Sequence, residues 1–340
     1  MNKTSVVAVV FEAEAPREAA DRVLRVLEAT RSQWRWQDRS LLTVHLEGAP
    51  TAAQSKEIGL VPGVACVRSL TRLLGKLPPV TLPNGAVIGT GTPAVIAGPC
   101  SVESERQVLE IARIVKDAGA SALRGGVFKP RSSPYSFGGL EEEGLRCLAR
   151  ARDATGLPLV TEALGVEHVD LVARVADVIQ IGSRNMQHFP LLFRAGANAP
   201  GRPVLLKRGF GCTVDELLQA AEYVQLGRLG AGREPGGLIL CERGIRTFEP
   251  SMRFTLDVGA IALVKDRGCA PIIADPSHAA GERRYVRPLA LSALAAGADG
   301  LLVEVHRDPD RAWSDGRQTL DADEFGRLMD DVGRLTPTRV

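Results

Sequence analysis

The sequence contains no apolar run near the roughly 20 residues that a membrane-spanning helix needs, so we expect no transmembrane segment. Its first sixteen residues hold only a short apolar run, at 6–11, and then acidic residues. They lack the long apolar core of a signal peptide. Six cysteines in 340 residues are too sparse for a disulfide framework. We therefore expect reduced thiols and a cytoplasmic protein.

The chain also lacks a strong net charge. Its 42 basic and 40 acidic residues leave +2 with neutral histidines, so no overall field attracts nucleic acid or an acidic membrane. Any binding of anions must depend on local clusters. Only seven of the 42 basic residues are lysines, so a lysine that lies inside a polar motif is a candidate functional residue.

Residues 1–70 predict a small α+β domain. Strand-like apolar runs and helical patterns follow one another there in the order β-α-β-β-α-β, which is typical of a ferredoxin-like domain. Residues 71–92 are rich in proline and glycine and predict a linker or a short hairpin cover.

From residue 93 to the end, short apolar strands alternate with amphipathic helices. The expected strands are 94–98, 122–125, 159–161, 178–181, 204–207, 238–241, 272–274 and 300–304. The first expected helix follows Ser104. The other seven are expected near residues 140–154, 166–175, 187–196, 213–226, 251–266, 284–296 and 322–334. Eight such units predict a (β/α)8 TIM barrel. A doubly wound open sheet is the alternative, but it usually has fewer units, and no G-x-G-x-x-G follows the first strand.

Nearly every expected barrel strand ends in a residue that can take part in chemistry. The carboxyl ends of barrel strands form the active face of this fold, so these side chains should converge. Seven cations belong to the set: Arg124, Lys129, Arg131, Arg184, Lys207, Arg208 and Arg243. They predict a strongly anionic ligand with two phosphates and a carboxylate. Arg208 is the weakest member, because side chains alternate along a strand and it should point away from Lys207.

A second group of strand-end residues predicts a metal site. Cys100, His278 and Glu304 end three strands that would be neighbours in a closed barrel, and Asp315 follows the last of them. Sulfur, nitrogen and oxygen ligands together suit a borderline divalent ion and do not choose among Zn, Mn, Fe and Co. The spacing matches no standard metal motif, so an inert buried Cys100 stays open, as does a supporting role for His306.

These residues lie in motifs that resemble those of the 3-deoxy-7-phosphoheptulonate (DAHP) synthase family, type Iβ branch. The motifs are Gly98-Pro99-Cys100-Ser101, Leu123-Arg124-Gly125-Gly126, Lys129-Pro130-Arg131-Ser132-Ser133, Gln180-Ile181-Gly182-Ser183-Arg184-Asn185, Leu206-Lys207-Arg208-Gly209, Cys241-Glu242-Arg243-Gly244, Asp275-Pro276-Ser277-His278, Glu304-Val305-His306 and Ser314-Asp315-Gly316. In this order they form a highly specific set. The resemblance runs from about residue 95 to residue 335, with a looser match over residues 1–70.

The resemblance implies condensation of phosphoenolpyruvate with erythrose 4-phosphate, the first step of the shikimate pathway. It implies one divalent metal ion (Mn, Co, Zn or Fe) held by Cys100, His278, Glu304 and Asp315. It assigns phosphoenolpyruvate to Arg124, Lys129, Ser183, Arg184, Lys207 and Arg243, and erythrose 4-phosphate to Lys129, Pro130, Arg131, Ser132, Ser133 and Asp275. Ser132 stands where threonine is commoner, but its hydroxyl survives.

Lys129, Cys100 and His278 are the expected catalytic residues. Lys129 is the candidate acid for the new hydroxyl, with a metal-bound water as its rival. Two other functions stay open: 3-deoxy-octulosonate-8-phosphate synthase, whose loop usually has asparagine where this chain has Pro130, and a barrel that senses a ligand without turnover.

The resemblance makes the N-terminal domain a regulatory unit that binds tyrosine or phenylalanine as a feedback effector. A purely oligomer-forming role is the alternative. A homotetramer is usual among relatives of this kind.

Overall fold

The computed structural model describes residues 4–12, 14–29, 34–37, 40–47, 50–70, 74–130, 133 and 135–335. The chain forms two compact units. One comprises Met1–Leu73 with Gln225–Pro235, and the other comprises Leu74–Val224 with Gly236–Val340.

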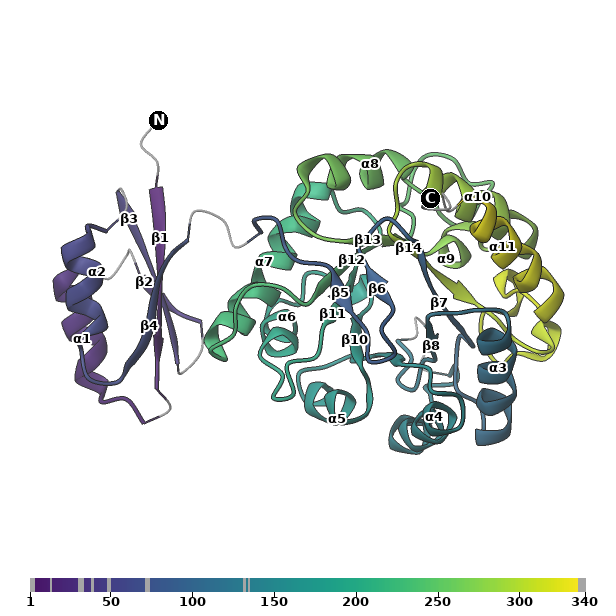
Figure 1. The fold of residues 1–340 in the computed structure, drawn as a ribbon, viewed down its shortest axis with the longest axis horizontal. Coiled ribbons are helices and arrows are strands. Elements are labelled where there is room, and N and C mark those ends of the chain that lie inside the picture. The colour runs from purple at the N-terminus through teal and green to yellow at the C-terminus, as the bar shows by residue number, and fades with distance from the viewer. Residues whose placement is uncertain are drawn as a thin grey trace. The chain divides into compact units, whose positions relative to one another are not determined.

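The N-terminal unit is a four-stranded antiparallel sheet with two helices on one face (Figure 1). Its elements are β1 (Thr4–Phe11), α1 (Arg17–Val26), β2 (Trp34–Trp36), β3 (Leu41–Glu47), α2 (Ala52–Gly59) and β4 (Val64–Leu70). The strand order β2-β3-β1-β4 is that of a ferredoxin-like domain, as the sequence predicts. Val7, Val9 and Phe11 alternate along β1 and are buried together with Val23 of α1 and Ile58 of α2.

The second unit is a closed parallel barrel of eight strands, which confirms the predicted fold class. The strands are β7 (Ala94–Gly98), β8 (Ala122–Arg124), β9 (Leu159–Glu162), β10 (Val178–Ile181), β11 (Val204–Lys207), β12 (Leu238–Glu242), β13 (Ile272–Ala274) and β14 (Gly300–Glu304). Every residue of these strands is buried, because helices cover the outside and side chains fill the inside. The continuous apolar runs of the sequence follow from this two-sided burial.

A hairpin of β5 (Val80–Thr81) and β6 (Val87–Ile88) packs against the amino-terminal ends of the barrel strands. Val80 and Ile88 share a buried cluster with Ile96 and other inward-facing strand residues. The Asn84 side chain donates to the carbonyl of Ser121, which precedes β8. The opposite, carboxyl-terminal end of the barrel carries the polar strand-end residues.

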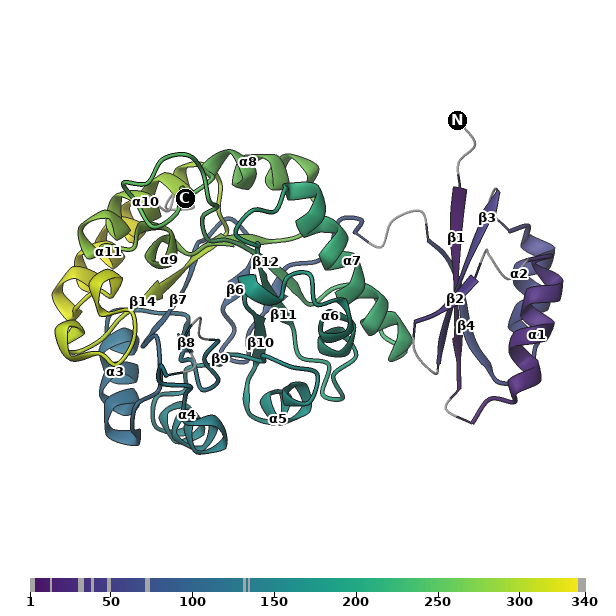
Figure 2. The same cartoon turned by 180° about the vertical axis from the view of Figure 1, so that it is seen from behind.

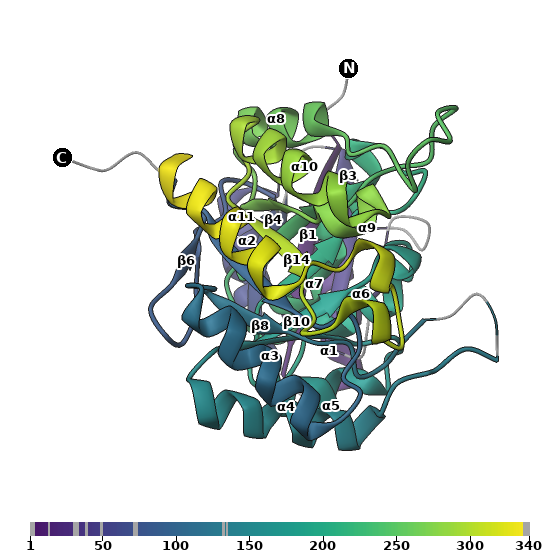
Figure 3. The same ribbon diagram turned by 90° about the vertical axis from the view of Figure 1, so that its right-hand side faces the viewer.

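The helices form an outer ring around the strands (Figures 1 and 2). They are α3 (Glu105–Asp117), α4 (Glu141–Thr155), α5 (His168–Val175), α6 (Phe189–Gly196), α7 (Val214–Gly230), α8 (Val258–Arg267), α10 (Arg283–Ala295) and α11 (Ala322–Leu335). The short helix α9 (Pro276–Ala280) directly follows β13 and lies inside this ring. The last helix, α11, packs against both α10 and α3 and so closes the ring (Figure 3). No described helix has the length and apolarity that a membrane crossing needs.

One expected helix boundary is wrong. The pattern predicts a helix over 251–266, but α8 begins at Val258. The Asp257 side chain accepts a hydrogen bond from the backbone N–H of Ala260 at 3.0 Å and caps the helix there. Thr255, just before this cap, pairs with Ile245 in an isolated β-bridge. Residues 251–257 are therefore irregular and lie near the carboxyl ends of the strands.

Candidate metal centre and anion pocket

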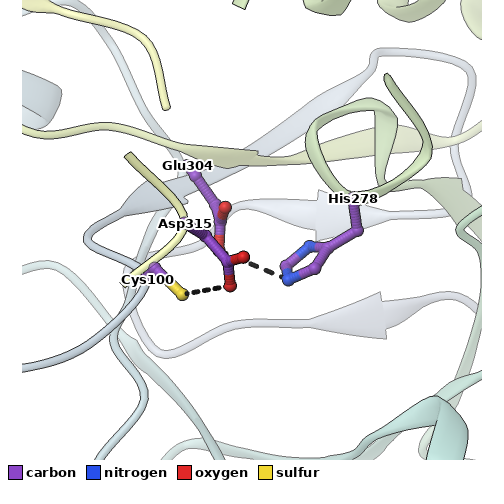
Figure 4. Close-up of side chains that lie close together, drawn as sticks. All are labelled: Cys100, His278, Glu304 and Asp315. Carbon is purple, nitrogen blue, oxygen red and sulfur yellow. Dashed lines mark hydrogen bonds and ion pairs between the residues drawn. The ribbon is translucent and has the colours of Figure 1, made fainter. Parts of the chain in front are cut away.

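Four potential metal ligands meet at the carboxyl ends of neighbouring barrel strands. Cys100 follows β7, His278 lies in α9 directly after β13, Glu304 ends β14, and Asp315 precedes the short helix η4 (Gly316–Gln318). One ligand atom from each residue lies within 4.8 Å of those of the other three (Figure 4). Residues up to 215 positions apart in the chain are brought together because β13, β14 and β7 are adjacent in the barrel.

The local backbone sets the direction of two of these side chains. Asp275 caps α9: its Oδ1 accepts from the backbone N–H of His278 at 3.0 Å, and its Oδ2 lies 2.7 Å from Nδ1 of the same histidine. This contact leaves Nε2 of His278 facing Glu304 Oε1 at 3.4 Å. Asp315 has a left-handed backbone, with φ 51°, which turns the chain into η4.

Arginine and glutamine side chains surround the two ligand carboxylates. Arg124 donates to Glu304 Oε1 at 3.0 Å, and Gln318 donates to Glu304 Oε2 at 2.6 Å. Arg253 donates to Asp315 Oδ1 at 3.1 Å. The thiol of Cys100 lies 3.2 Å from Asp315 Oδ2. Each carboxylate therefore has a partner on both oxygens.

The charges of the site favour ionised carboxylates and a protonated thiol. Burial opposes ionisation of Glu304, yet His278 and Arg124 lower the pKa of its carboxyl group. Burial likewise opposes ionisation of Asp315, but His278 and Arg253 hold its pKa below the usual range. Burial, and then the charge of Glu304, raise the pKa of Cys100 to about 12.

This donor set fits a divalent cation. One sulfur, one imidazole nitrogen and two carboxylate oxygens are the ligands that borderline divalent ions prefer. A bound cation also supplies the positive charge that a Cys100 thiolate needs in this buried position.

A cavity of about 300 Å³ opens beside this cluster and is rich in cations. Its lining includes Arg124, Lys129, Arg184, Lys207, Arg243 and Arg253, together with the potential ligands His278 and Asp315. Such a concentration of positive charge in a protein of net charge +2 favours an anionic ligand. The cluster of potential ligands and the cation-rich cavity thus adjoin each other, with His278 and Asp315 common to both.

Lys207 and Arg243 are held firmly in this cavity. Lys207 Nζ lies 2.5 Å from Asp275 Oδ2, and both groups are buried. Burial is the largest opposing effect on Asp275, but His278 and Lys207 hold its pKa well below the ordinary value. The guanidinium carbon of Arg243 lies 4.9 Å from the ring centroid of Phe210 and 4.2 Å from that of Phe254. Burial lowers the pKa of Arg243 to about 10, so it stays charged at neutral pH.

Most of the expected site residues line this cavity or its edge. Pro130, Ser133 and Ser183 are among the lining residues, whereas Arg131 and Ser132 lie outside the described residues. Arg208 turns away from the cavity, as its place beside Lys207 predicts, and pairs with Glu242 and Asp257, each at 2.9 Å. His306 is not part of the ligand cluster: its Nδ1 lies against the backbone of Asp308, and its Nε2 lies 3.7 Å from Glu103 Oε2.

Three further residues of the site, Arg253, Phe210 and Gln318, are not indicated by the sequence patterns. Arg253 lies in the irregular stretch that was expected to be helical, Phe210 belongs to a loop, and Gln318 follows the expected ligand Asp315 by three residues. None of them ends a strand. The only available signal for Gln318 was its closeness to Asp315 in the chain.

Comparison with known proteins links this site to one family. The family model described as "DAHP synthetase I family" matches residues 78–337. A phospho-2-dehydro-3-deoxyheptonate aldolase of Thermotoga maritima is 48% identical over 248 residues, which cover 73% of this chain and 71% of that protein. A 2-dehydro-3-deoxyphosphooctonate aldolase of Syntrophobacter fumaroxidans is 31% identical over 272 residues, covering 74% of this chain and 91% of the relative.

Solved structures give the same result. The crystal structure of the DAHP synthase of Thermotoga maritima matches with a TM-score of 0.73 and 37% identity, and covers 98% of this chain and 97% of that one. A truncated form of the 3-deoxy-D-arabino-heptulosonate 7-phosphate synthase from the same organism matches with a TM-score of 0.68 and 43% identity, over 76% of this chain and 92% of the other.

Proposed function

Because the chain belongs to the DAHP synthetase I family, we propose that its barrel condenses phosphoenolpyruvate with D-erythrose 4-phosphate and water. The products are 3-deoxy-D-arabino-heptulosonate 7-phosphate and inorganic phosphate, and the reaction opens the shikimate pathway. The observation that carries the proposal is one cavity lined by six cationic side chains and by two members, His278 and Asp315, of a cluster of four potential metal ligands.

The cations of the cavity would bind the two substrates. Arg124, Lys129, Arg184, Lys207 and Arg243 would hold the phosphate and carboxylate of phosphoenolpyruvate, beside Ser183. Lys129, Pro130, Arg131, Ser132 and Ser133 would bind erythrose 4-phosphate, with Asp275 near one of its hydroxyls. Two phosphates and a carboxylate together would neutralise much of the positive charge that lines the cavity.

Cys100, His278, Glu304 and Asp315 would hold one divalent ion, which we propose to be Mn, Co, Zn or Fe. When bound, such an ion supplies Lewis-acid polarisation of an aldehyde oxygen. Asp275 fixes the orientation of the His278 ring through its contact with Nδ1, so that Nε2 faces the other ligands.

Lys129 would act as the acid in carbon–carbon bond formation. The enol carbon of phosphoenolpyruvate attacks the aldehyde carbon, and Lys129 would give a proton to the oxygen that becomes the new hydroxyl. A solvent molecule is the rival donor. The Lys129 ammonium lies 3.0 Å from Cys100 Sγ, so it is next to the ligand cluster and also lines the cavity.

Phosphate departs in the second half of the reaction. Water adds to C2 of the former phosphoenolpyruvate, where positive charge develops, and the adduct then loses inorganic phosphate. Arg184, Lys207 and Arg243 would stabilise the charge that grows on this leaving group.

A second candidate substrate is arabinose 5-phosphate, because several relatives of about 30% identity are 2-dehydro-3-deoxyphosphooctonate aldolases. The resemblance favours erythrose 4-phosphate, because Pro130 stands where the loop of the octulosonate-phosphate branch usually has asparagine. A non-catalytic sensing barrel is set aside by membership of an enzyme family.

The test measures release of inorganic phosphate from phosphoenolpyruvate with erythrose 4-phosphate, with arabinose 5-phosphate, and with neither sugar. We expect release to need erythrose 4-phosphate and to stop after treatment with a strong chelator. A higher rate with arabinose 5-phosphate would show that the enzyme is a 3-deoxy-octulosonate-8-phosphate synthase instead. Undiminished activity in the presence of the chelator would contradict the proposed metal site.

We also propose that the N-terminal domain binds tyrosine or phenylalanine as a feedback effector and that the enzyme works as a homotetramer. Six free cysteines, one of them the potential ligand Cys100, support a reducing compartment such as the cytoplasm.

A further inference from the structure

Gln318 and Arg253 connect the two carboxylates of the ligand cluster. The Gln318 amide nitrogen donates to Glu304 Oε2 at 2.6 Å, and its amide oxygen accepts from Arg253 Nη1 at 2.8 Å. The same guanidinium nitrogen donates to Asp315 Oδ1 at 3.1 Å. A continuous bridge therefore runs from Glu304 through Gln318 and Arg253 to Asp315.

The bridge uses only one oxygen of each carboxylate. It takes Oε2 of Glu304 and Oδ1 of Asp315. The remaining oxygens face the other potential ligands: Glu304 Oε1 lies 3.4 Å from His278 Nε2, and Asp315 Oδ2 lies 3.2 Å from Cys100 Sγ. The bridge thus leaves one oxygen of each carboxylate facing the other potential ligands, although Arg124 also donates to Glu304 Oε1 at 3.0 Å.

The chemistry of glutamine suits the middle of this bridge. Its amide offers a donor to the anion Glu304 and an acceptor to the cation Arg253, so only one amide orientation satisfies both neighbours. Gln318 is 2% exposed, and its hydrogen bond to Glu304 is buried.

The backbone links Gln318 firmly to Asp315. The N–H of Gln318 donates to the carbonyl oxygen of Asp315 at 3.3 Å, and the hydroxyl of Thr319 donates to the same oxygen at 3.0 Å. A Cβ at Gly316 would lie 2.2 Å from the carbonyl oxygen of Pro309, so the turn between Asp315 and Gln318 requires this glycine.

We propose that Gln318 and Arg253 are positioning residues that hold Glu304 and Asp315 in the geometry that binds a divalent ion. The inference rests on the proposed metal site. Partners of ligand side chains outside the coordination sphere change metal affinity by about 10–100-fold when they are removed. Neither residue is required to touch the ion or the substrates.

The test uses Co²⁺ binding to the full chain, followed by the thiolate-to-cobalt absorption band and by competition with a chelating dye. We expect Gln318→Ala and Arg253→Met each to weaken Co²⁺ binding roughly 10–100-fold. Arg253→Lys should recover part of the loss because it keeps a cationic donor. The matched control is Arg287→Ala. Arg287 of α10 donates to Asp331 of α11 at 2.6 Å, so this variant also loses an arginine–carboxylate pair, but it should bind Co²⁺ as the wild type does.

The outcomes separate this inference from the proposed function. A wild-type protein without the thiolate band would contradict the metal site itself. A wild-type protein with the band, together with Gln318→Ala and Arg253→Met variants that bind Co²⁺ within twofold of it, would overturn only the positioning roles. If Gln318→Ala does not fold, Arg253→Met decides the matter, because the Arg253 side chain is 38% exposed.

Discussion

The ammonium nitrogen of Lys129 lies 3.0 Å from Sγ of Cys100 and 2.9 Å from the carbonyl oxygen of the same residue. Gly126 leaves the room for this approach, since a Cβ there would be 2.8 Å from Cδ of Lys129. The proposed proton donor is thus held beside a proposed metal ligand by the backbone as well as by charge.

Replacement of Lys129 should separate catalysis from metal binding. We expect Lys129→Met to lower kcat by about 10²–10⁴-fold, because the variant loses a positioned general acid. Lys129→Arg should not restore kcat, since a guanidinium keeps the charge but gives up its proton poorly. Steady-state kinetics and Co²⁺ binding on the same preparations provide the check. A Lys129→Arg variant with near-normal kcat would contradict the acid role and leave only a charge role.

Replacement of Cys100 should remove both the ion and the activity. Cys100→Ala lacks the sulfur ligand, so we expect metal content after dialysis and phosphate release to fall together to background. Cys147→Ala is the matched control, because Cys147 is also buried but lies in α4 and is not part of the ligand cluster. Metal analysis and the phosphate assay measure the two effects. Full activity in Cys100→Ala would exclude the thiolate as a required ligand.

The barrel could be predicted from the sequence to within a few residues because its strands are buried on both faces. The apolar runs at 94–98, 178–181 and 300–304 have the bounds that the structure gives to β7, β10 and β14. The convergence of Cys100, His278, Glu304 and Asp315 then follows from strand adjacency in a closed barrel.

The residues between the strands could not be predicted in the same way. Arg253 reaches Asp315 from an irregular segment whose apolar spacing resembles a helix, and no periodic pattern reports where such a loop folds back. Phe210 contacts Arg243 from another loop. The fold therefore indicates the four potential ligands, while the residues that contact them depend on loop geometry.

Phe210 should affect phosphoenolpyruvate more than erythrose 4-phosphate. Its ring centroid lies 4.9 Å from the guanidinium carbon of Arg243 and 5.4 Å from that of Arg184. A cation–π contact contributes about 0.5–2 kcal/mol, so we expect Phe210→Ala to raise KM for phosphoenolpyruvate roughly 2–30-fold. Phe210→Tyr should keep the wild-type KM. Phe189→Ala, which removes a ring stacked on Tyr223, is the control. Equal changes in both KM values would argue against a selective effect on these arginines.

Glu242 should make stability depend on pH in a defined direction. Burial raises the pKa of its carboxyl group even though Arg208 donates to it. The folded state therefore holds this proton more tightly than the unfolded state, and the resulting stabilisation is complete below about pH 4.5 and is lost as the pH rises through the raised pKa. Glu242→Gln lacks this effect. Urea denaturation gives the free energy of unfolding of the wild type and of the variant at each pH. The wild-type value minus the variant value should decrease as the pH is raised from 4.5 to 7. A difference that increases with pH would refute the assignment.

Removal of residues 1–73 should leave turnover intact and abolish inhibition by tyrosine or phenylalanine. The truncation ends before Leu74 because Leu74 and Leu77 pack in the main core of the barrel unit, and the hairpin of β5 and β6 fills the amino-terminal end of the barrel. All described residues of the proposed metal and anion site lie after this point, so we expect the truncated enzyme to keep its activity. Phosphate release is measured against amino-acid concentration for both forms, with sedimentation to compare their subunit numbers. Unchanged inhibition of the truncated form would move the effector site to the barrel. Inhibition absent from both forms, with fewer subunits after truncation, would favour an oligomer-forming role instead.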